Sequence, residues 1–288
     1  MLLAQAVLPG RFAVATVDHG LRDQSASEAS LVGAICAQHS IKHYVITLAL
    51  GSGSGVQTRA RAARYSALGA WLKAEGLGAL VTAHHADDQA ETLLMRLKRG
   101  AGVRGLAAMR PQVPVPGHSD LTLLRPLLSW RRSELNEIVF AAGIKPVDDP
   151  SNRDLRFERA RLRADLALSN WLDIAALVRS AGHLAEADFA LDWAVARAFA
   201  DVRQEGDVIF WEPGQIPRVL GIRVLERIVE ALGRSKPRGS ELARWFDALA
   251  GGRIATLASV RGNGADRIWN FVTVKPPRIN RQSVNQPA

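Results

Sequence analysis

The sequence predicts an α/β protein in which a parallel β-sheet is flanked by helices, followed by a helical region and a small α+β C-terminal region. Three observations predict it. Short apolar runs alternate with segments of helical periodicity as far as Gly105. Strands separated by helices of this length are typical of βαβ units and a parallel sheet. Residues 165–203 are rich in alanine and leucine with almost no glycine or proline, and short strand and helix patterns mix after Asp207.

The individual elements follow from apolar periodicity and from the turn residues that bound them. Strands are expected at 12–17, 44–48, 80–83 and 121–128, and helices at 25–39, 56–73, 89–97 and 130–143. Residues 111–117 are rich in proline and glycine and are expected to form a loop, and residues 148–152 (DDPSN) have turn chemistry. We therefore expect an α/β domain over 1–165, a helical connecting region over 166–205, an α+β domain over 206–278 and a disordered tail over 279–288.

The charge balance indicates a polyanionic partner. The chain has 37 Lys and Arg against 28 Asp and Glu, a formal charge of +9 and a pI near 10.5. Nucleic acid is the favoured partner, ahead of an anionic membrane surface. No apolar run is long enough to cross a membrane. The single cysteine, Cys36, excludes an internal disulfide and a CxxC motif, so we expect a cytoplasmic protein.

Residues 84–92 (HHADDQAET) are the strongest candidate for a catalytic site. They lie between a predicted strand and a predicted helix, where ligands bind in open α/β sheets. Asp88 and Glu91 share a helix face, and His84 lies one turn upstream. Two carboxylates and an imidazole could hold Mg²⁺, an ammonium group or both. The alternative is a charged first turn that only stabilises the helix dipole.

Two basic segments follow. Residues 96–105 (RLKRGAGVRG) form a glycine-rich basic loop suited to phosphate, in which Arg99, Gly100 and Gly102 are the candidate contacts. Residues 153–163 hold five arginines, of which Arg156, Arg159 and Arg163 have the spacing of one helical face. This face indicates RNA binding at least as strongly as it indicates a solvated helix surface.

Six blocks in order make the chain resemble the tRNA(Ile)-lysidine synthases, a family of the PP-loop ATP pyrophosphatase group. The resemblance extends over roughly 12–166 and implies the adenine-nucleotide α-hydrolase-like fold of that group. The blocks are 17–22 (VDHGLR), 60–65 (ARAARY), 84–105, 125–128 (RPLL), 149–152 (DPSN) and 159–163 (RARLR).

The resemblance implies a reaction and its participants. ATP and Mg²⁺ would activate C2 of the wobble cytidine of tRNA(Ile) with a CAU anticodon as an adenylate, and the ε-amino group of free L-lysine would displace AMP. Neither DNA nor a membrane is implied as a partner. The 206–278 domain would assist tRNA binding.

The same resemblance carries over residue roles. His84, Asp88 and Glu91 would line the lysine and catalytic site with Arg64 nearby, and Asp88 would hold the metal. Asp18 and His19 would lie at the nucleotide site.

One departure from the family is the absence of its Ser-Gly-Gly-x-Asp-Ser loop, which wraps the pyrophosphate of ATP. The chain starts inside what resembles the helix after that loop, so we expect an N-terminally shortened form whose 288 residues do not adenylate. Residues 51–55 (GSGSG) lack the frame to replace the loop, and Gln57 stands where the family more often has Glu.

Three alternatives remain open at this point. The first is a catalytically inactive tRNA-binding remnant. The second is a PP-loop tRNA thiolase, for which one cysteine is too few. The third is an amidating ligase, which would be expected to lack the 149–152 and arginine blocks.

Overall fold

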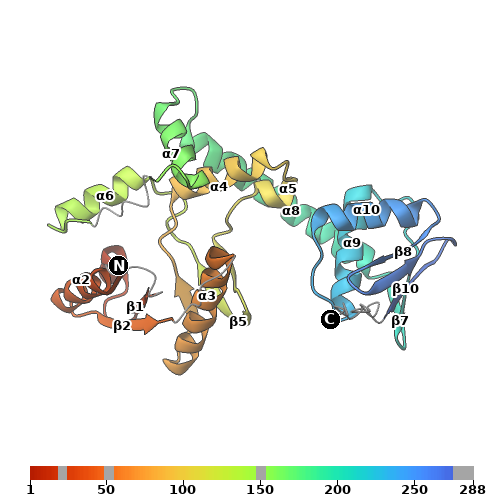
Figure 1. Cartoon of the computed structure of the whole chain (residues 1–288), viewed down its shortest axis with the longest axis horizontal. Helices are drawn as coiled ribbons and strands as arrows, with labels where there is room; N and C mark the ends of the chain where they lie inside the picture. Colours follow the sequence, from red (N-terminus) through yellow and green to blue (C-terminus); the bar gives the residue numbers. More distant parts are fainter. Residues whose placement is uncertain (19–24, 49–54, 147–153, 275–288) are drawn as a thin grey trace, which may run out of the picture. The chain divides into compact units, whose positions relative to one another are not determined.

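The computed structural model describes residues 1–18, 25–48, 55–146 and 154–274. These divide into two compact units, Met1–Ala185 and Glu186–Ala288 (Figure 1). The predicted tail, His19 and the 149–152 block lie outside the described residues. No helix within the described ranges combines the length and the apolar character that crossing a bilayer requires.

The strands of the first unit pair mainly in parallel, which confirms the predicted fold class. β1 (Ala13–Asp18) pairs with β2 (Lys42–Thr47), and β3 (Ala79–Val81) pairs with β5 (His118–Leu124). β4 (Gln112–Val115) adds an antiparallel edge to β5.

The predicted loop over 111–117 was therefore wrong. These residues form β4 and the turn that joins it to β5. Gly117 has a φ of +83°, a conformation that glycine adopts without a steric penalty. Pro114 is tolerated because β4 is an edge strand, and the register shifts at Pro114 and Val115.

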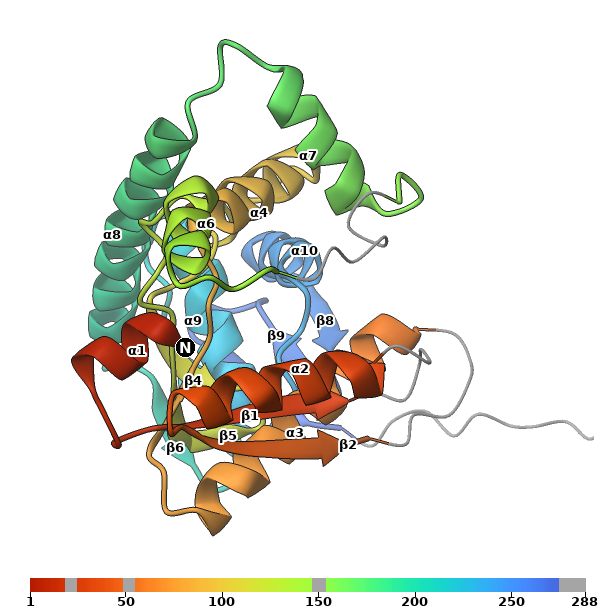
Figure 2. The same cartoon turned by 90° about the vertical axis from the view of Figure 1, so that its left-hand side faces the viewer.

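Helices cover these strands. α2 lies along β1 and β2 (Figure 2), and α3 packs on β3 and β5. The helices of the first unit are α1 (Leu2–Val7), α2 (Ser25–Gln38), α3 (Val56–Ala74), α4 (Ala86–Lys98), α5 (Val103–Leu106), α6 (Arg132–Ala141) and α7 (Glu158–Leu168), and α8 (Ile174–Phe199) begins in it. α4 starts three residues before the predicted position, because His85 caps it.

One apolar core joins the two strand pairs of the first unit. Its buried residues come from α3 and from the three-stranded sheet: Tyr65, Leu68, Leu72, Leu80, Val115, Leu121 and Leu123. Ala15, Val17 and Ile46, from β1 and β2, pack against this cluster. The core thus holds β1, β2 and the β3–β5 pair around α3.

The second unit contains an antiparallel sheet in the order β6-β7-β10-β9-β8, with helices α9 and α10, which confirms the predicted α+β region. Its elements are β6 (Arg203–Glu205), β7 (Val208–Trp211), α9 (Arg218–Ala231), α10 (Gly239–Ala250), β8 (Ile254–Leu257), β9 (Val260–Asn263) and β10 (Trp269–Thr273). The buried Arg223 of α9 donates to Asp188 at 2.6 Å and to Asp192 at 2.7 Å, and so fixes the second half of α8 within this unit.

The β3–β5 pair is expected to depend on Leu123, whose side chain is fully buried (0% exposed). Leu123→Ala should lower the free energy of unfolding of the first unit by about 2–5 kcal/mol, because it leaves a cavity in a packed core. Urea-dependent hydrogen exchange of amides in β3 and β5 measures this. Val81→Ala, at a 59% exposed position of the same sheet, is the control and should change the value by less than about 0.5 kcal/mol. Equal effects of the two substitutions would contradict the assigned core.

Candidate active site

The site is built where β3 ends and α4 begins. The pairing of β3 with β5 continues past the last strand residue, since the Thr82 N–H donates to the Leu124 carbonyl at 3.0 Å. Because β3 and β5 are parallel, Thr82 and His84 lie at the same sheet edge as Arg125, which follows β5. Ligands bind beyond this edge in open α/β sheets.

His84 is oriented by a neighbour and surrounded by charge. Its Nδ1 and the Thr82 hydroxyl are hydrogen-bonded at 2.9 Å. Burial is the main cause that lowers the pKa of His84 below its ordinary value; Asp88 opposes the shift, and Arg125, Arg61 and Arg159 add to it. The lowered pKa favours the uncharged imidazole at neutral pH, the form that can accept a proton.

Asp88 has a structural role in addition to its predicted one. His85 is the N-cap of α4: its Nδ1 accepts from the Asp88 N–H at 3.4 Å, and the Asp88 carboxylate accepts from the His85 N–H at 3.1 Å. This reciprocal pattern is a capping box. The other Asp88 oxygen lies 3.5 Å from the Arg163 guanidinium. Asp88 therefore stabilises the helix start and carries charge at the site.

Glu91 is almost fully buried (2% exposed) and is paired with Arg163. Arg163 Nε donates to Glu91 at 2.5 Å and Nη2 at 3.3 Å, and burial alone would oppose the charged state of both groups. The hydrogen bond from Arg163 to Glu91 is the main cause that raises the pKa of Arg163. This pair ties α7 to α4, so Arg163 faces inward rather than toward a phosphate-binding surface.

Arg125 is a site residue to which the sequence patterns assigned no role. It is buried, its Nη1 donates to the Arg110 carbonyl at 2.8 Å, and its Nε has no hydrogen-bond partner among the described residues. No carboxylate in the described part of the chain pairs with it. A buried guanidinium without a counter-ion at a sheet edge favours an anionic ligand. The available signal was its position after a strand parallel to β3.

Arg61 and Thr82 were also missed. Arg61 is exposed on α3, one turn before the predicted Arg64, and it stacks on Tyr65 at 5.0 Å from the ring centroid. Thr82 lies between β3 and His84. Thr82 has a role through its hydrogen bond to His84, and Arg61 has one through its positive charge near His84. Neither relation is visible in the sequence pattern.

The arginine run does not form one helical face. Arg156 precedes α7 and is paired with Asp154 at 2.7 Å, so of the three predicted residues only Arg159 and Arg163 lie on the helix. Arg159 is exposed and is one of the positive charges that act on His84. The predicted common face of the three residues was wrong because the Asp154–Arg156 turn ends before the helix begins.

The predicted phosphate loop contains a helix end and a short helix. Arg99 is the C-cap residue of α4 and is ion-paired with Glu158 of α7. Gly100 has a φ of +67°, and Gly102 is the N-cap residue of α5. α5 is a single turn. The ion pair of Arg99 with Glu158 connects the end of α4 to the start of α7.

Two further predicted residues lie on other elements. Asp18 is the last residue of β1, and Arg64 is exposed on α3. Within the ranges that the structure describes, no group of three His, Cys, Asp or Glu side chains is arranged to hold a metal ion.

Comparisons with known proteins agree with this geometry. A family model described as the PP-loop domain matches residues 2–169. A tRNA(Ile)-lysidine synthase of Novosphingobium aromaticivorans is 50% identical over 283 residues, covering 98% of this chain and 87% of that protein. One from Zymomonas mobilis is 40% identical over 282 residues, covering 96% and 85%.

A solved structure supports the fold alone. The U34-tRNA thiolase NcsA from Methanococcus maripaludis, with its iron–sulfur cluster, has a TM-score of 0.51 and 17% identity, and the alignment covers 64% of this chain and 67% of that one. The match of the PP-loop domain to more than half of the chain, together with relatives that align along almost all of it, identifies the family. The chain belongs to the tRNA(Ile)-lysidine synthase family of PP-loop proteins.

Proposed function

We propose that this protein joins the ε-amino group of free L-lysine to C2 of the wobble cytidine, C34, of tRNA(Ile) with a CAU anticodon, converting ATP to AMP and pyrophosphate. The observation that carries the proposal is the environment of His84: its Nδ1 is hydrogen-bonded to Thr82 at 2.9 Å, burial lowers its pKa, and the Asp88 carboxylate and guanidinium groups on the surrounding elements act on it. Family membership supports the choice of substrates, because the similar relatives are named for this activity.

In the first step the C2 carbonyl oxygen of the cytosine forms a bond to the α-phosphorus of ATP, and pyrophosphate leaves. Negative charge on the phosphates requires cationic groups that are already in position. Arg125 and Arg159 supply them in this proposal. Asp18, His19 and the Arg99–Gly100–Gly102 turn are proposed for the nucleotide side.

Mg²⁺ fits the site through a single carboxylate. The Asp88 side chain, which is 14% exposed, is proposed to provide one ligand, and Mg²⁺ in phosphoryl-transfer sites commonly takes one or two carboxylates, with phosphate oxygens and water completing its shell. When bound, the ion would neutralise developing charge on the phosphates.

In the second step the lysine amine attacks C2, and the bond between C2 and the oxygen of AMP breaks. The amine loses a proton, which His84 accepts at Nε2 when its Nδ1–H donates to Thr82. Asp88 attracts the lysine ammonium before the reaction. Glu91 acts through Arg163, whose guanidinium keeps Asp88 in place.

For tRNA binding we propose Arg159 and Arg156 on the first unit, with the second unit assisting. Arg156 needs to exchange its Asp154 partner for a phosphate to do so. Arg163 is proposed to act on tRNA only through its effect on α7. We place the protein in the cytoplasm, where a buried free cysteine such as Cys36 stays reduced.

The test is incorporation of labelled lysine into a CAU-anticodon tRNA(Ile) transcript, with pyrophosphate release and mass spectrometry of the digested tRNA. It uses the 288-residue chain and the same chain joined to an N-terminal segment that carries a Ser-Gly-Gly-x-Asp-Ser loop. Lysidine from either supports the proposal. Binding of tRNA without lysidine or pyrophosphate from both would favour the inactive tRNA-binding alternative.

Asp88→Asn should reduce ligation by about 10²–10³-fold in whichever of the two proteins is active, because a charge partner of the reacting groups is lost. Asparagine retains an oxygen for the cap, so the fold should persist. Affinity for tRNA should change little in a filter-binding assay. Near-normal turnover would make Asp88 a capping residue only.

Arg159→Ala should weaken tRNA binding and flatten the dependence of log affinity on log salt concentration by roughly one unit. The reason is the loss of one phosphate contact from an exposed guanidinium. Arg11→Ala, at an exposed position before β1, is the matched control and should leave the slope unchanged. A slope that Arg159→Ala does not alter would remove this residue from the RNA surface.

The acid limb of the pH–rate profile should lie below about pH 6.5, the ordinary value for histidine. The pKa of His84 is lowered, so the imidazole stays uncharged as the pH falls to that lower value, and activity is lost below it. Arg61→Ala removes one positive charge that lowers the pKa of His84, so the acid limb should move toward higher pH. A limb that stays in place in this variant, or one that lies above pH 6.5 in the wild type, would exclude His84 as the base.

A further inference from the structure

The second unit has three aromatic rings that each lie beside an arginine. Arg197 lies over the ring of Trp193 at 5.0 Å from the centroid, and Arg227 lies over Phe199 at 5.8 Å. Arg203 lies directly opposite Phe210 in the β6–β7 pair, so their side chains share a face. Phe199 packs against the core of the unit, so we leave out its pair with Arg227 and call the other four residues the aromatic–arginine surface: Trp193, Arg197, Arg203 and Phe210.

This surface is exposed because α8 is held by its opposite face. Asp188 and Val195 are buried, and Asp188 is paired with Arg223 of α9. The outward face keeps two large rings in solvent: Phe189 is 75% exposed and Trp193 is 59% exposed. Neighbouring large apolar groups in solvent are typical of an interaction site, whereas single exposed hydrophobic residues are ordinary.

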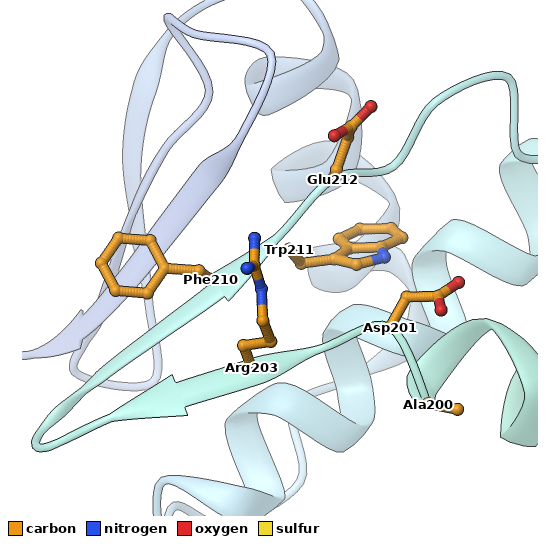
Figure 3. A pocket seen from close by; sticks show the side chains of 6 residues that line it. All are labelled: Ala200, Asp201, Arg203, Phe210, Trp211 and Glu212. Atoms are coloured by element: carbon orange, nitrogen blue, oxygen red, sulfur yellow. The ribbon is translucent and has the colours of Figure 1, made fainter.

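A cavity continues the surface beyond the end of α8. It has a volume of about 530 Å³ and is lined by Ala200, Asp201, Arg203, Phe210, Trp211 and Glu212 (Figure 3). Trp193 and Arg197 share the outward face of α8, and Ala200, which follows α8 and donates to the Arg197 carbonyl at 3.1 Å, lines the cavity. Figure 3 shows Arg203 extending from β6 toward β7, with the Phe210 ring on its left and Trp211, Glu212 and Asp201 on its right.

We propose that the aromatic–arginine surface and its cavity hold unpaired bases of an RNA. Bases stack on aromatic rings and on guanidinium planes, whatever their sequence. The arginine beside each ring also matches the phosphate that accompanies each base. Inside the cavity, the Asp201 carboxylate can accept from a base amino group and Arg203 can donate to a base carbonyl, whereas Glu212 is already paired with Arg267 at 2.7 Å. The proposal rests on the proposed tRNA substrate and adds a site on the second unit to it.

The experiment measures binding of the full chain to the tRNA(Ile) transcript by filter retention at low and at high salt. Trp193→Ala should weaken binding about fivefold or more at both salt concentrations, because stacking is less screened than a phosphate contact. Trp193→Phe should retain most of the affinity. Arg261→Ala, at an exposed position of β9 in the same unit, is the matched control and should have no effect on base stacking.

Phe210→Ala tests the cavity separately and should also weaken binding about fivefold or more, with circular dichroism confirming the fold. Unchanged affinity in both Trp193→Ala and Phe210→Ala would overturn the proposal. So would a wild-type dimer, seen by sedimentation, that Trp193→Ala dissociates without changing tRNA affinity. The readout is binding, so a failure to form lysidine in the separate ligation assay would refute the proposed function and leave this result standing.

Discussion

The ion pair between Glu91 and Arg163 is the contact on which the arrangement of the site depends. A carboxylate with 2% exposure is strongly destabilising unless a cation and hydrogen bonds compensate for lost hydration. Arg163 provides both, from a position 72 residues further along the chain. Because its guanidinium also approaches Asp88, the pair links the start of α4, its buried face and α7 in one network. Removal of either partner leaves an uncompensated charge inside the first unit.

The charges around His84 reconcile two requirements of the proposed chemistry. A nucleotide needs cations close to its phosphates, whereas a base that accepts a proton from an amine has to be uncharged. In the proposed reaction Arg125 and Arg159 meet the first requirement, and together with Arg61 they favour the second, since each positive charge lowers the pKa of His84 in the same direction as burial. Asp88 opposes the shift and preserves affinity for a cationic substrate. In the proposed reaction the same arginines therefore serve both steps.

The two units solve different physical problems. The first places polar groups at one edge of parallel strands, which requires long connections through helices. The second builds its core from short antiparallel strands and two helices, and Trp211, Trp269 and Phe271 are among its large buried side chains. Its sheet and α8 leave aromatic and arginine side chains at the surface. A positively charged chain with a chemical site on one unit and stacking groups on the other suits a large, folded nucleic-acid substrate.

The sequence by itself determined the α/β class, the order of most helices and strands, the strand-to-helix junction that carries His84 and Asp88, and the family. These features depend on neighbours within one element, where spacing dictates which side chains share a face. Only the tertiary structure decided the direction of Arg163, the exclusion of Arg156 from α7, the β4 hairpin and the roles of Arg125, Arg61 and Thr82. Long charged side chains reach several possible partners, and burial of Glu91 selects among them. That burial arises from packing between segments far apart in the chain, which periodicity along one segment does not encode.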